Sequence, residues 1–305
     1  MITKFGKRFI ANYLAGNILF TQKDIALGIG KTAVNAKGND TRLEFEFYRL
    51  PATLGSIDIS QTGTDVDGDP IFSYVVIYKA TIPQDVSGVI SEIGLYPSTR
   101  SSTNNYDSKF LTSFENNLSW LDALEGNPAL KLNDPATSFY AKIGENMVQY
   151  TVPANTAKEY KNTILSFDLS GYSANDSLSI AYKKVDNNTS KIRVKLYSSD
   201  TSYYYADFTP SGSNEDKIQP VSMNTVFTNS VNSPDATNIT KVGLEVTAGS
   251  GGTTNVYFDG LRINDEDTFD PAYGLISRSV FSSGNELVKP SGRAVDIEYK
   301  LQLGF

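Results

Sequence analysis

Alternating apolar and polar positions mark strands along much of this 305-residue chain. The predicted strand 42–50 begins with a strict alternation of charged and apolar positions: Arg42, Glu44 and Glu46 against Leu43, Phe45 and Phe47. Residues 295–303 repeat the pattern with Val295, Ile297, Tyr299, Leu301 and Leu303. Because successive side chains of a strand point to opposite faces, each segment is a predicted strand with one buried face.

Only one segment has a helical pattern, at residues 5–14, where Phe9, Ile10, Tyr13 and Leu14 would share a face. Further strands are predicted at residues 25–30, 56–60, 71–82, 89–96, 163–169, 177–182, 191–197, 203–208, 221–228, 239–246, 255–263 and 273–280. Gly, Asn, Asp or Pro occupy the turns between them. Short strands that recur without a helical period between them predict an all-β protein made of antiparallel sandwiches.

Two polar segments interrupt the strand pattern and predict how the chain is divided. Residues 97–109 are rich in Ser, Thr and Asn, and residues 264–271 are mainly polar, so both are expected to be hinges. We expect residues 1–108 and 267–305 to form one β-sandwich docking domain, with residues 109–266 inserted as a second, jelly-roll sandwich. Insertion is structurally feasible because termini and insertion points commonly lie on a domain surface.

Composition removes most enzymatic and nucleic-acid functions. The chain has no Cys and no His, which excludes disulfides, thiolate chemistry, imidazole bases and His-ligated metals. Its net charge of −7 opposes binding to phosphate backbones, so no nucleic acid is expected. No stretch approaches the roughly 20 apolar residues of a membrane span. Asn12, Gly16 and Asn17 interrupt the only signal-like apolar run, so we expect no signal peptide and synthesis in the cytoplasm.

Glycoside hydrolysis is the main enzymatic chemistry that this composition leaves, since it needs only two carboxylates. The conceivable acidic residues are Glu145, Glu159, Asp168, Asp207 and Glu245. Their spacing singles out no pair, and solvated acidic residues are expected in any acidic domain. We therefore predict that the protein is not an enzyme.

Two short motifs resemble ligand loops but favour simpler interpretations. Asp65-Val-Asp-Gly-Asp-Pro70 lacks the later Glu of an EF-hand loop and is predicted to be a hairpin turn. Gly28-Ile-Gly-Lys-Thr32 does not meet the spacing of a phosphate-binding loop, and no helix pattern follows it.

The outer segments resemble the N-terminal modules of tail-collar fibre and baseplate-associated proteins of tailed phages. The resemblance rests on Leu27-Gly-Ile-Gly-Lys-Thr-Ala33, Thr41–Arg49, Val75–Ile82, Val89-Ile-Ser-Glu-Ile-Gly-Leu-Tyr96, Gly274–Arg278 and Asp296–Tyr299. Its most specific part is Glu92-Ile-Gly-Leu-Tyr96. It implies a β-sandwich docking domain within a virion. A fibre or receptor-binding part often follows such modules, whereas here the chain returns to complete the first domain.

The inserted segment resembles jelly-roll modules of the carbohydrate-binding and galactose-binding-like type. The matching residues are Ser113-Phe-Glu115 with Trp120, and Val256-Tyr-Phe-Asp-Gly-Leu261. In that group an early Glu and a late Asp often hold a structural calcium ion, which implies Glu115 and Asp259 as ligands here. Calcium takes six to eight oxygen ligands, so backbone carbonyls would have to complete such a site.

Aromatic residues of the insert have two open interpretations. Trp120 and Tyr204 are candidate ligands of a glycan, since aromatic rings can stack on sugars. The alternative is ordinary packing, because in a strand Tyr203 and Tyr205 share one face and Tyr204 takes the other.

Together these features predict a structural component of a tailed-phage particle, located in the tail, collar, baseplate or capsid. The outer domain would dock onto other virion proteins and display the jelly roll. Because such parts are cyclic, we expect a homotrimer or a larger ring. The alternative is a carbohydrate-binding protein for host adhesion or capsid decoration that binds a host-surface glycan.

Overall fold

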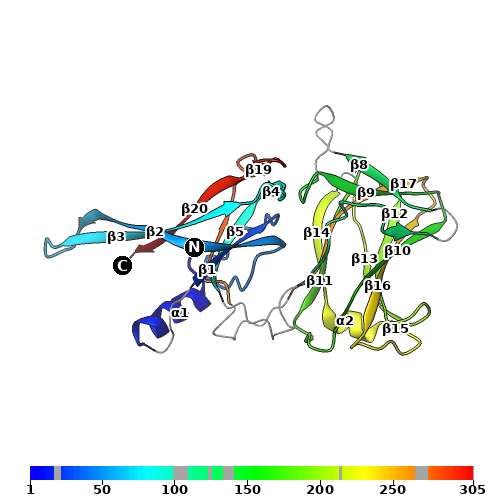
Figure 1. Cartoon of the computed structure of the whole chain (residues 1–305), viewed down its shortest axis with the longest axis horizontal. Helices are drawn as coiled ribbons and strands as arrows, with labels where there is room; N and C mark the ends of the chain where they lie inside the picture. Colours follow the sequence, from blue (N-terminus) through cyan, green and yellow to red (C-terminus); the bar gives the residue numbers. More distant parts are fainter. Residues whose placement is uncertain are drawn as a thin grey trace. The chain divides into compact units, whose positions relative to one another are not determined.

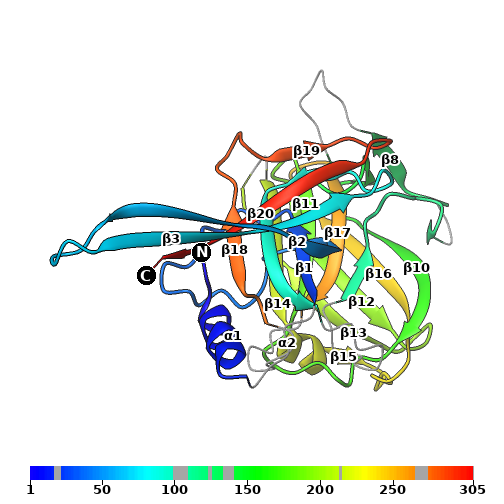
Figure 2. The ribbon, with the colours of Figure 1, turned by 60° about the vertical axis from the view of Figure 1, so that its left-hand side comes forward.

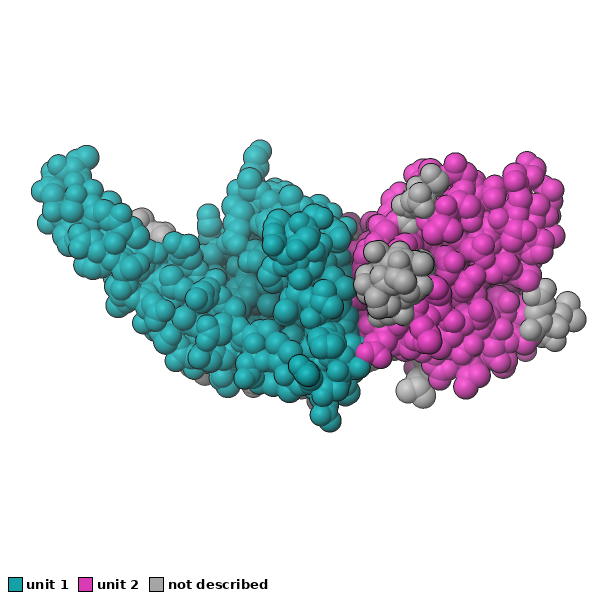
Figure 3. Space-filling view, turned by 90° about the horizontal axis from the view of Figure 1, so that it is seen from above, with its two compact units in different colours: residues 1–102, 267–305 teal, residues 103–266 magenta. Residues whose placement is uncertain are grey.

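The computed structural model describes residues 1–16, 22–98, 109–122, 126–132, 141–212, 215–264 and 274–304. The chain divides into two compact units, Met1–Ser102 with Asp267–Phe305 (unit 1) and Thr103–Glu266 (unit 2) (Figure 3). The expected hinges at residues 97–109 and 264–271 lie largely outside the described residues. Among the described residues, no helix has the length and apolar character needed to cross a membrane.

Both units consist of antiparallel strands, which confirms the predicted all-β class (Figure 1). Unit 1 contains α1 (Lys4–Leu14), β1 (Gln22–Gly28), β2 (Glu46–Thr64), β3 (Pro70–Ile82), β4 (Gly88–Ile90), β5 (Glu92–Ser98), β18 (Ser277–Val280), β19 (Leu287–Lys289) and β20 (Val295–Gly304). Unit 2 begins with β6 (Lys109–Thr112), β7 (Trp120–Leu121), β8 (Ala129–Leu132), β9 (Asn146–Val152), β10 (Ala157–Phe167) and β11 (Ser177–Lys184). It continues with β12 (Thr189–Tyr197), β13 (Tyr203–Phe208), β14 (Glu215–Ser222), α2 (Met223–Thr228), β15 (Ser230–Val231), β16 (Ile239–Ala248) and β17 (Thr254–Asn264).

The main sheet of unit 1 joins the two ends of the chain. Its order is β18-β5-β1-β2-β3-β20, and β4 pairs separately with β19. Apolar side chains of this sheet form a core with Phe9 of α1. The strand predicted at residues 42–50 begins only at Glu46 and continues through residues 56–60 to Thr64, although Leu43 and Phe45 are buried as expected.

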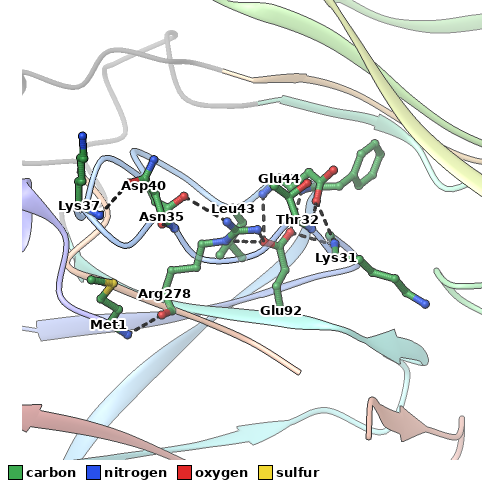
Figure 4. Close-up of polar contacts among 12 residues, drawn as sticks. Met1, Lys31, Thr32, Asn35, Lys37, Asp40, Leu43, Glu44, Glu92 and Arg278 are labelled. Carbon is green, nitrogen blue, oxygen red and sulfur yellow. Dashed lines mark hydrogen bonds and ion pairs between the residues drawn. The ribbon is translucent and has the colours of Figure 1, made fainter. Parts of the chain in front are cut away.

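Glu92, in the motif that carries the phage resemblance, is the centre of a network of polar contacts in unit 1 (Figure 4). Its side chain is 0% exposed, and its carboxylate accepts hydrogen bonds from the backbone N–H groups of Gly30, Glu44 and Phe45 at 2.8–3.1 Å. Arg278 donates to the same carboxylate from Nε and Nη2. One buried side chain therefore holds β5, both ends of the β1–β2 connection and the C-terminal segment together.

A long hairpin extends from the sheet of unit 1 (Figure 2). We call it the arm: residues 54–76 of β2 and β3, with residues 299–303 of β20 paired to its inner half. The turn at its tip is formed by Asp65, whose Oδ1 accepts the N–H groups of Asp67 and Asp69, both at 2.9 Å. This confirms the predicted hairpin turn. The arm has exposed apolar residues, among them Leu54, Ile57, Ile59 and Phe72.

Unit 2 is a sandwich of two antiparallel sheets. One has the order β15-β13-β12-β16-β10-β7, and the other has the order β14-β11-β17-β9-β8, with β6 also paired to β17. The sheets bury a large core between them that includes Phe114, Trp120, Tyr150, Phe208 and Phe258. One face of each sheet is therefore filled by the core, and the first sheet has a second face that carries polar and aromatic side chains.

Candidate functional site

The face of the first sheet that points away from the core of unit 2 gathers three tyrosines and several charged residues. Strand register places Tyr205 beside Lys195 and Lys195 beside Gly243, while Tyr203 pairs with Tyr197. Because paired residues of neighbouring strands lie on the same face of the sheet, these side chains form one surface. We call it the tyrosine face: Glu159, Lys161, Arg193, Lys195, Tyr197, Tyr203, Tyr205, Asp207, Gly243 and Glu245.

The tyrosine rings form a row across β12 and β13. The ring centroids of Tyr197 and Tyr203 are 4.8 Å apart at an interplanar angle of 51°, and those of Tyr203 and Tyr205 are 6.2 Å apart at 59°. The Arg193 guanidinium lies 4.1 Å from the Tyr205 centroid and is held by Asp207 through two hydrogen bonds of 2.6 and 2.7 Å. Tyr203 and Tyr205 are partly exposed, so part of each ring remains accessible.

Lys195 is the polar centre of this face. Only 6% of it is exposed, and its Nζ donates to Glu159 Oε2 at 2.9 Å and to Glu245 Oε2 at 2.8 Å. Burial by itself lowers the pKa of Lys195, but the hydrogen bonds with Glu245 and Glu159 outweigh it, so the pKa lies above its ordinary value. Lys195 is therefore a fixed cation between two carboxylates.

Tyr197 adds a hydroxyl to the same network. Its OH donates to Glu159 Oε1 at 2.6 Å, and burial together with this carboxylate raises the pKa of the phenol well above its ordinary value. The Lys161 ammonium lies 4.6 Å from the Tyr197 ring centroid. The polar groups of the face are thus held in place by one another before any ligand arrives.

Gly243 leaves the space that this network occupies. A Cβ atom at this position would come within 2.4 Å of Glu159 Oε1 and 2.7 Å of Tyr197 Cε2. Such distances are well below van der Waals contact, so only glycine allows both side chains to lie over β16. The absence of a side chain at residue 243 is therefore part of the site.

Of the two aromatic residues singled out from the sequence, neither lies on the tyrosine face. Trp120 is 0% exposed and packs in the core with its ring 5.0 Å from Phe114. Tyr204 points to the core side of its strand, where it meets Phe227 edge-on, and its OH donates to the Pro234 carbonyl at 2.9 Å. The outward tyrosines of this strand are Tyr203 and Tyr205, because strand geometry places them opposite Tyr204.

Glu115 and Asp259, the suggested calcium ligands, both lie against the segment 142–146. The Glu115 carboxylate accepts the N–H groups of Glu145 and Asn146, and Asp259 accepts those of Lys142 and Ile143. Burial raises the pKa of Asp259 to about 7, although these N–H groups and the Lys142 charge lower it.

This surrounding does not fit a calcium ion, which needs oxygen ligands where Glu115 and Asp259 face N–H donors. Within the described parts of the chain, no three Asp, Glu, His or Cys side chains are placed to hold a metal. Calcium at these two carboxylates stays a prediction, and it would require the segment 142–146 to rearrange.

No protein family model and no curated protein sequence matches this chain. Similar solved structures include an exo-β-agarase, with 14% identity and a TM-score of 0.35 over 51% of this chain and 25% of that one. The family 30 carbohydrate-binding module of a Clostridium thermocellum cellulosomal cellulase has 12% identity and a TM-score of 0.36 over 52% of this chain and 98% of the module.

The surface glycan-binding protein PbSGBP-B of Prevotella bryantii has 12% identity and a TM-score of 0.35 over 77% of this chain and 81% of that one. This chain thus spans a quarter of the agarase and nearly all of the family 30 module. At such TM-scores these similarities do not define what the chain binds, and its function has to be argued from the site.

Proposed function

We propose that this protein binds carbohydrate without catalysing a reaction, and that the tyrosine face is its binding surface. The observation that carries the proposal is the pair of partly exposed rings of Tyr203 and Tyr205, in a row with the buried Tyr197. Beside this row lies the fixed group Lys195, Glu159 and Glu245. Sugars combine apolar C–H faces with hydroxyl groups that both donate and accept hydrogen bonds. Aromatic rings suit the former, and fixed charged groups suit the latter.

The electrostatics of the face favour a glycan over the other common polar ligands. Its cations Lys161, Arg193 and Lys195 equal in number its carboxylates Glu159, Asp207 and Glu245, and the whole chain has a net charge of −7. Phosphate-rich ligands need an excess of cations, which this arrangement does not supply. A neutral oligosaccharide fits a surface where donors and acceptors are balanced.

The absence of catalysis is part of the proposal. Glu159 and Glu245 were among the carboxylates considered for glycoside hydrolysis, and they do lie side by side on β10 and β16. Both, however, are hydrogen-bonded to the same Lys195 cation, and Glu159 also accepts the Tyr197 hydroxyl. A hydrolase needs two carboxyl groups that can reach the scissile bond, whereas these two are both engaged by Lys195.

A glycan screen tests this proposal, followed by titration of the best oligosaccharide. Tyr203→Ala and Tyr205→Ala should each weaken binding about ten-fold or more, as expected for aromatic anchors. Tyr13→Ala removes an exposed tyrosine of unit 1 and should leave affinity unchanged. Failure of the chain to bind any glycan, or equal loss in Tyr13→Ala, would contradict the proposal.

We also propose that unit 1 attaches the chain to a tailed-phage particle, in the tail, collar, baseplate or capsid. The supporting observation is that Glu92, in the motif on which the resemblance rests, binds Arg278 and so unites both outer segments. The tyrosine face would then serve host adhesion or decoration. Antibodies to the chain should label purified particles of the phage that encodes it, and the absence of the chain from those particles would refute this part.

A further inference from the structure

The arm of unit 1 has one apolar face. Strand register places Ile57 opposite Val76, Ile59 opposite Tyr74, and Gln61 opposite Phe72. On the other side of β3, Leu301 pairs with Val76 and Leu303 with Tyr74. Together with Leu54, which pairs with Tyr78, these residues share one face of a three-stranded sheet.

This face continues the core of unit 1 into solvent. Tyr78, Tyr299 and Leu301 are 3–6% exposed and belong to the core, whereas Leu54, Ile57 and Ile59 are 56–61% exposed. Phe72 is 40% exposed. Monomeric proteins seldom leave contiguous apolar residues of this size in water, and those that do commonly use them as interfaces.

The opposite face of the arm has a different character. It carries Ser56, Asp58 and Ser60 on β2 and Lys300 and Gln302 on β20, with Val75 and Ile77 of β3 between them. The ion pair of Lys79 with Glu298 at 2.9 Å lies near its base. A mainly polar face opposite an apolar one is the pattern of a sheet with one covered side. The apolar face of the arm therefore has the composition of a surface that is covered in the working protein.

We propose that the covering element is the same face of other copies of this chain. The apolar face has no charged residue, so identical faces can meet without like-charge repulsion. The edges also permit association: β20 is the last strand of its sheet, and among the described residues no strand pairs with the outer side of β2 beyond Ala52. Open edges readily accept strands from another chain.

The area of the apolar face of the arm indicates how many copies of the chain are needed for a stable contact. Eight residues of β2 at about 3.3 Å each, across three strands about 4.8 Å wide each, give a face of about 380 Å². Two such faces bury about 760 Å², below the roughly 1,200 Å² of a stable interface, so contact of two faces alone is weak. Three arms around one axis bury about 1,140 Å² in total and gain strand pairing between the open edges of neighbouring copies, so a ring of at least three copies is favoured.

The test uses the full chain and two neighbouring positions on opposite faces of the arm. Sedimentation should give the mass of three or more chains for the native protein and for Ser60→Asp, and the mass of one chain for Ile59→Asp. Ile59 is 61% exposed, so its replacement should leave the circular dichroism spectrum unchanged. A native protein that stays monomeric at all concentrations overturns the proposal, as does an oligomer that persists in Ile59→Asp.

A second test of the contact between arms does not require a charged substitution. The chain has no Cys, so a single introduced thiol gives an unambiguous cross-link. On oxidation Ile59→Cys should form disulfide-linked dimers, because copies meet at this face, and Ser60→Cys should form many times fewer. Equal cross-linking of the two variants would overturn the proposal. Neither experiment involves glycan binding, so its result is independent of the proposed function.

Discussion

Arg278 donates two hydrogen bonds to Glu92 in unit 1, from Nε at 2.9 Å and from Nη2 at 2.7 Å, and both end on Oε2. The two residues are 186 positions apart in the sequence and are 3% and 0% exposed. Arg278 also contacts Asp40 at 3.2 Å. A buried pair of this kind links the segment that follows unit 2 in the sequence to the segment that precedes it.

Replacing Arg278 should destabilise unit 1 and leave unit 2 intact. Arg278→Ala leaves the Glu92 charge buried without its cation, which commonly costs about 3–5 kcal/mol. The only Trp of the chain, Trp120, lies in the core of unit 2, so its fluorescence reports on that unit alone. In urea, circular dichroism should therefore show an earlier transition while the Trp120 transition stays unchanged.

Glu298→Gln is the matched control for this experiment, because it breaks an ion pair of unit 1 whose partners are 46–55% exposed. Exposed pairs contribute about 1 kcal/mol or less, so its unfolding curve should nearly match that of the native chain. An equally small effect in Arg278→Ala would show that the Glu92–Arg278 pair does not hold unit 1 together.

Lys195 should be essential to the tyrosine face. Lys195→Met leaves Glu159 and Glu245, which face each other across β10 and β16, with no cation between them. We expect a loss of about 3–5 kcal/mol in the free energy of unfolding of unit 2, measured by Trp120 fluorescence in urea. Adding Glu245→Gln should recover part of that loss, because it removes the repulsion. A loss below about 1 kcal/mol would instead indicate a loosely held surface pair.

Gly243→Ala should damage the same face through shape alone. The added Cβ would meet Glu159 and Tyr197, so one of them must move, at a cost of about 1–3 kcal/mol. Glycan affinity should fall with it. Gly249→Ala is the control, since its added Cβ would lie at an ordinary 3.4 Å from the Asn188 carbonyl oxygen. Equal stability and affinity in the two variants would mean that Gly243 makes no room for the network.

The part of the site that lies within single strands could be predicted from the sequence. Alternation predicted that Tyr203 and Tyr205 share a face, and the register confirms it. The sequence also indicates that Tyr203 and Tyr205 point away from the core. Ala206 and Phe208 are apolar and lie on the same face of the strand as Tyr204, so that face is the buried one. Tyr204 therefore belongs with the core.

The remainder of the site could not be predicted, because it depends on which strands become neighbours in the sheet. Glu159, Lys195 and Glu245 meet only because β12 and β10 both pair with β16, an order that no periodicity reveals. The same holds for Glu92 and Arg278. Periodicity also placed strand ends poorly. Residues 46–50 of the predicted strand 42–50 and the segment 56–60 belong to one strand, β2, because its apolar pattern is interrupted where its partners change from β1 to β3.

Asp259 should make the stability of unit 2 fall as pH rises. Its pKa is about 7 in the folded protein and 3.8 ordinarily, chiefly because the carboxyl group is buried. Between these values the folded chain holds a proton that the unfolded chain has lost, so stability decreases from about pH 4 to about pH 7, by up to roughly 4 kcal/mol.

This titration can be isolated by comparing variants that differ at one carboxyl group. Asp259→Asn cannot titrate, so the midpoint of its thermal transition, followed by Trp120 fluorescence, should vary less with pH than that of the native chain. Asp216→Asn removes a neighbouring carboxylate that is 47% exposed and bonded to Lys142, and it should keep most of the native pH dependence. Identical pH profiles for the native chain and Asp259→Asn would mean that the buried carboxyl group is already ionised in the folded protein at low pH, held so by the N–H groups of Lys142 and Ile143.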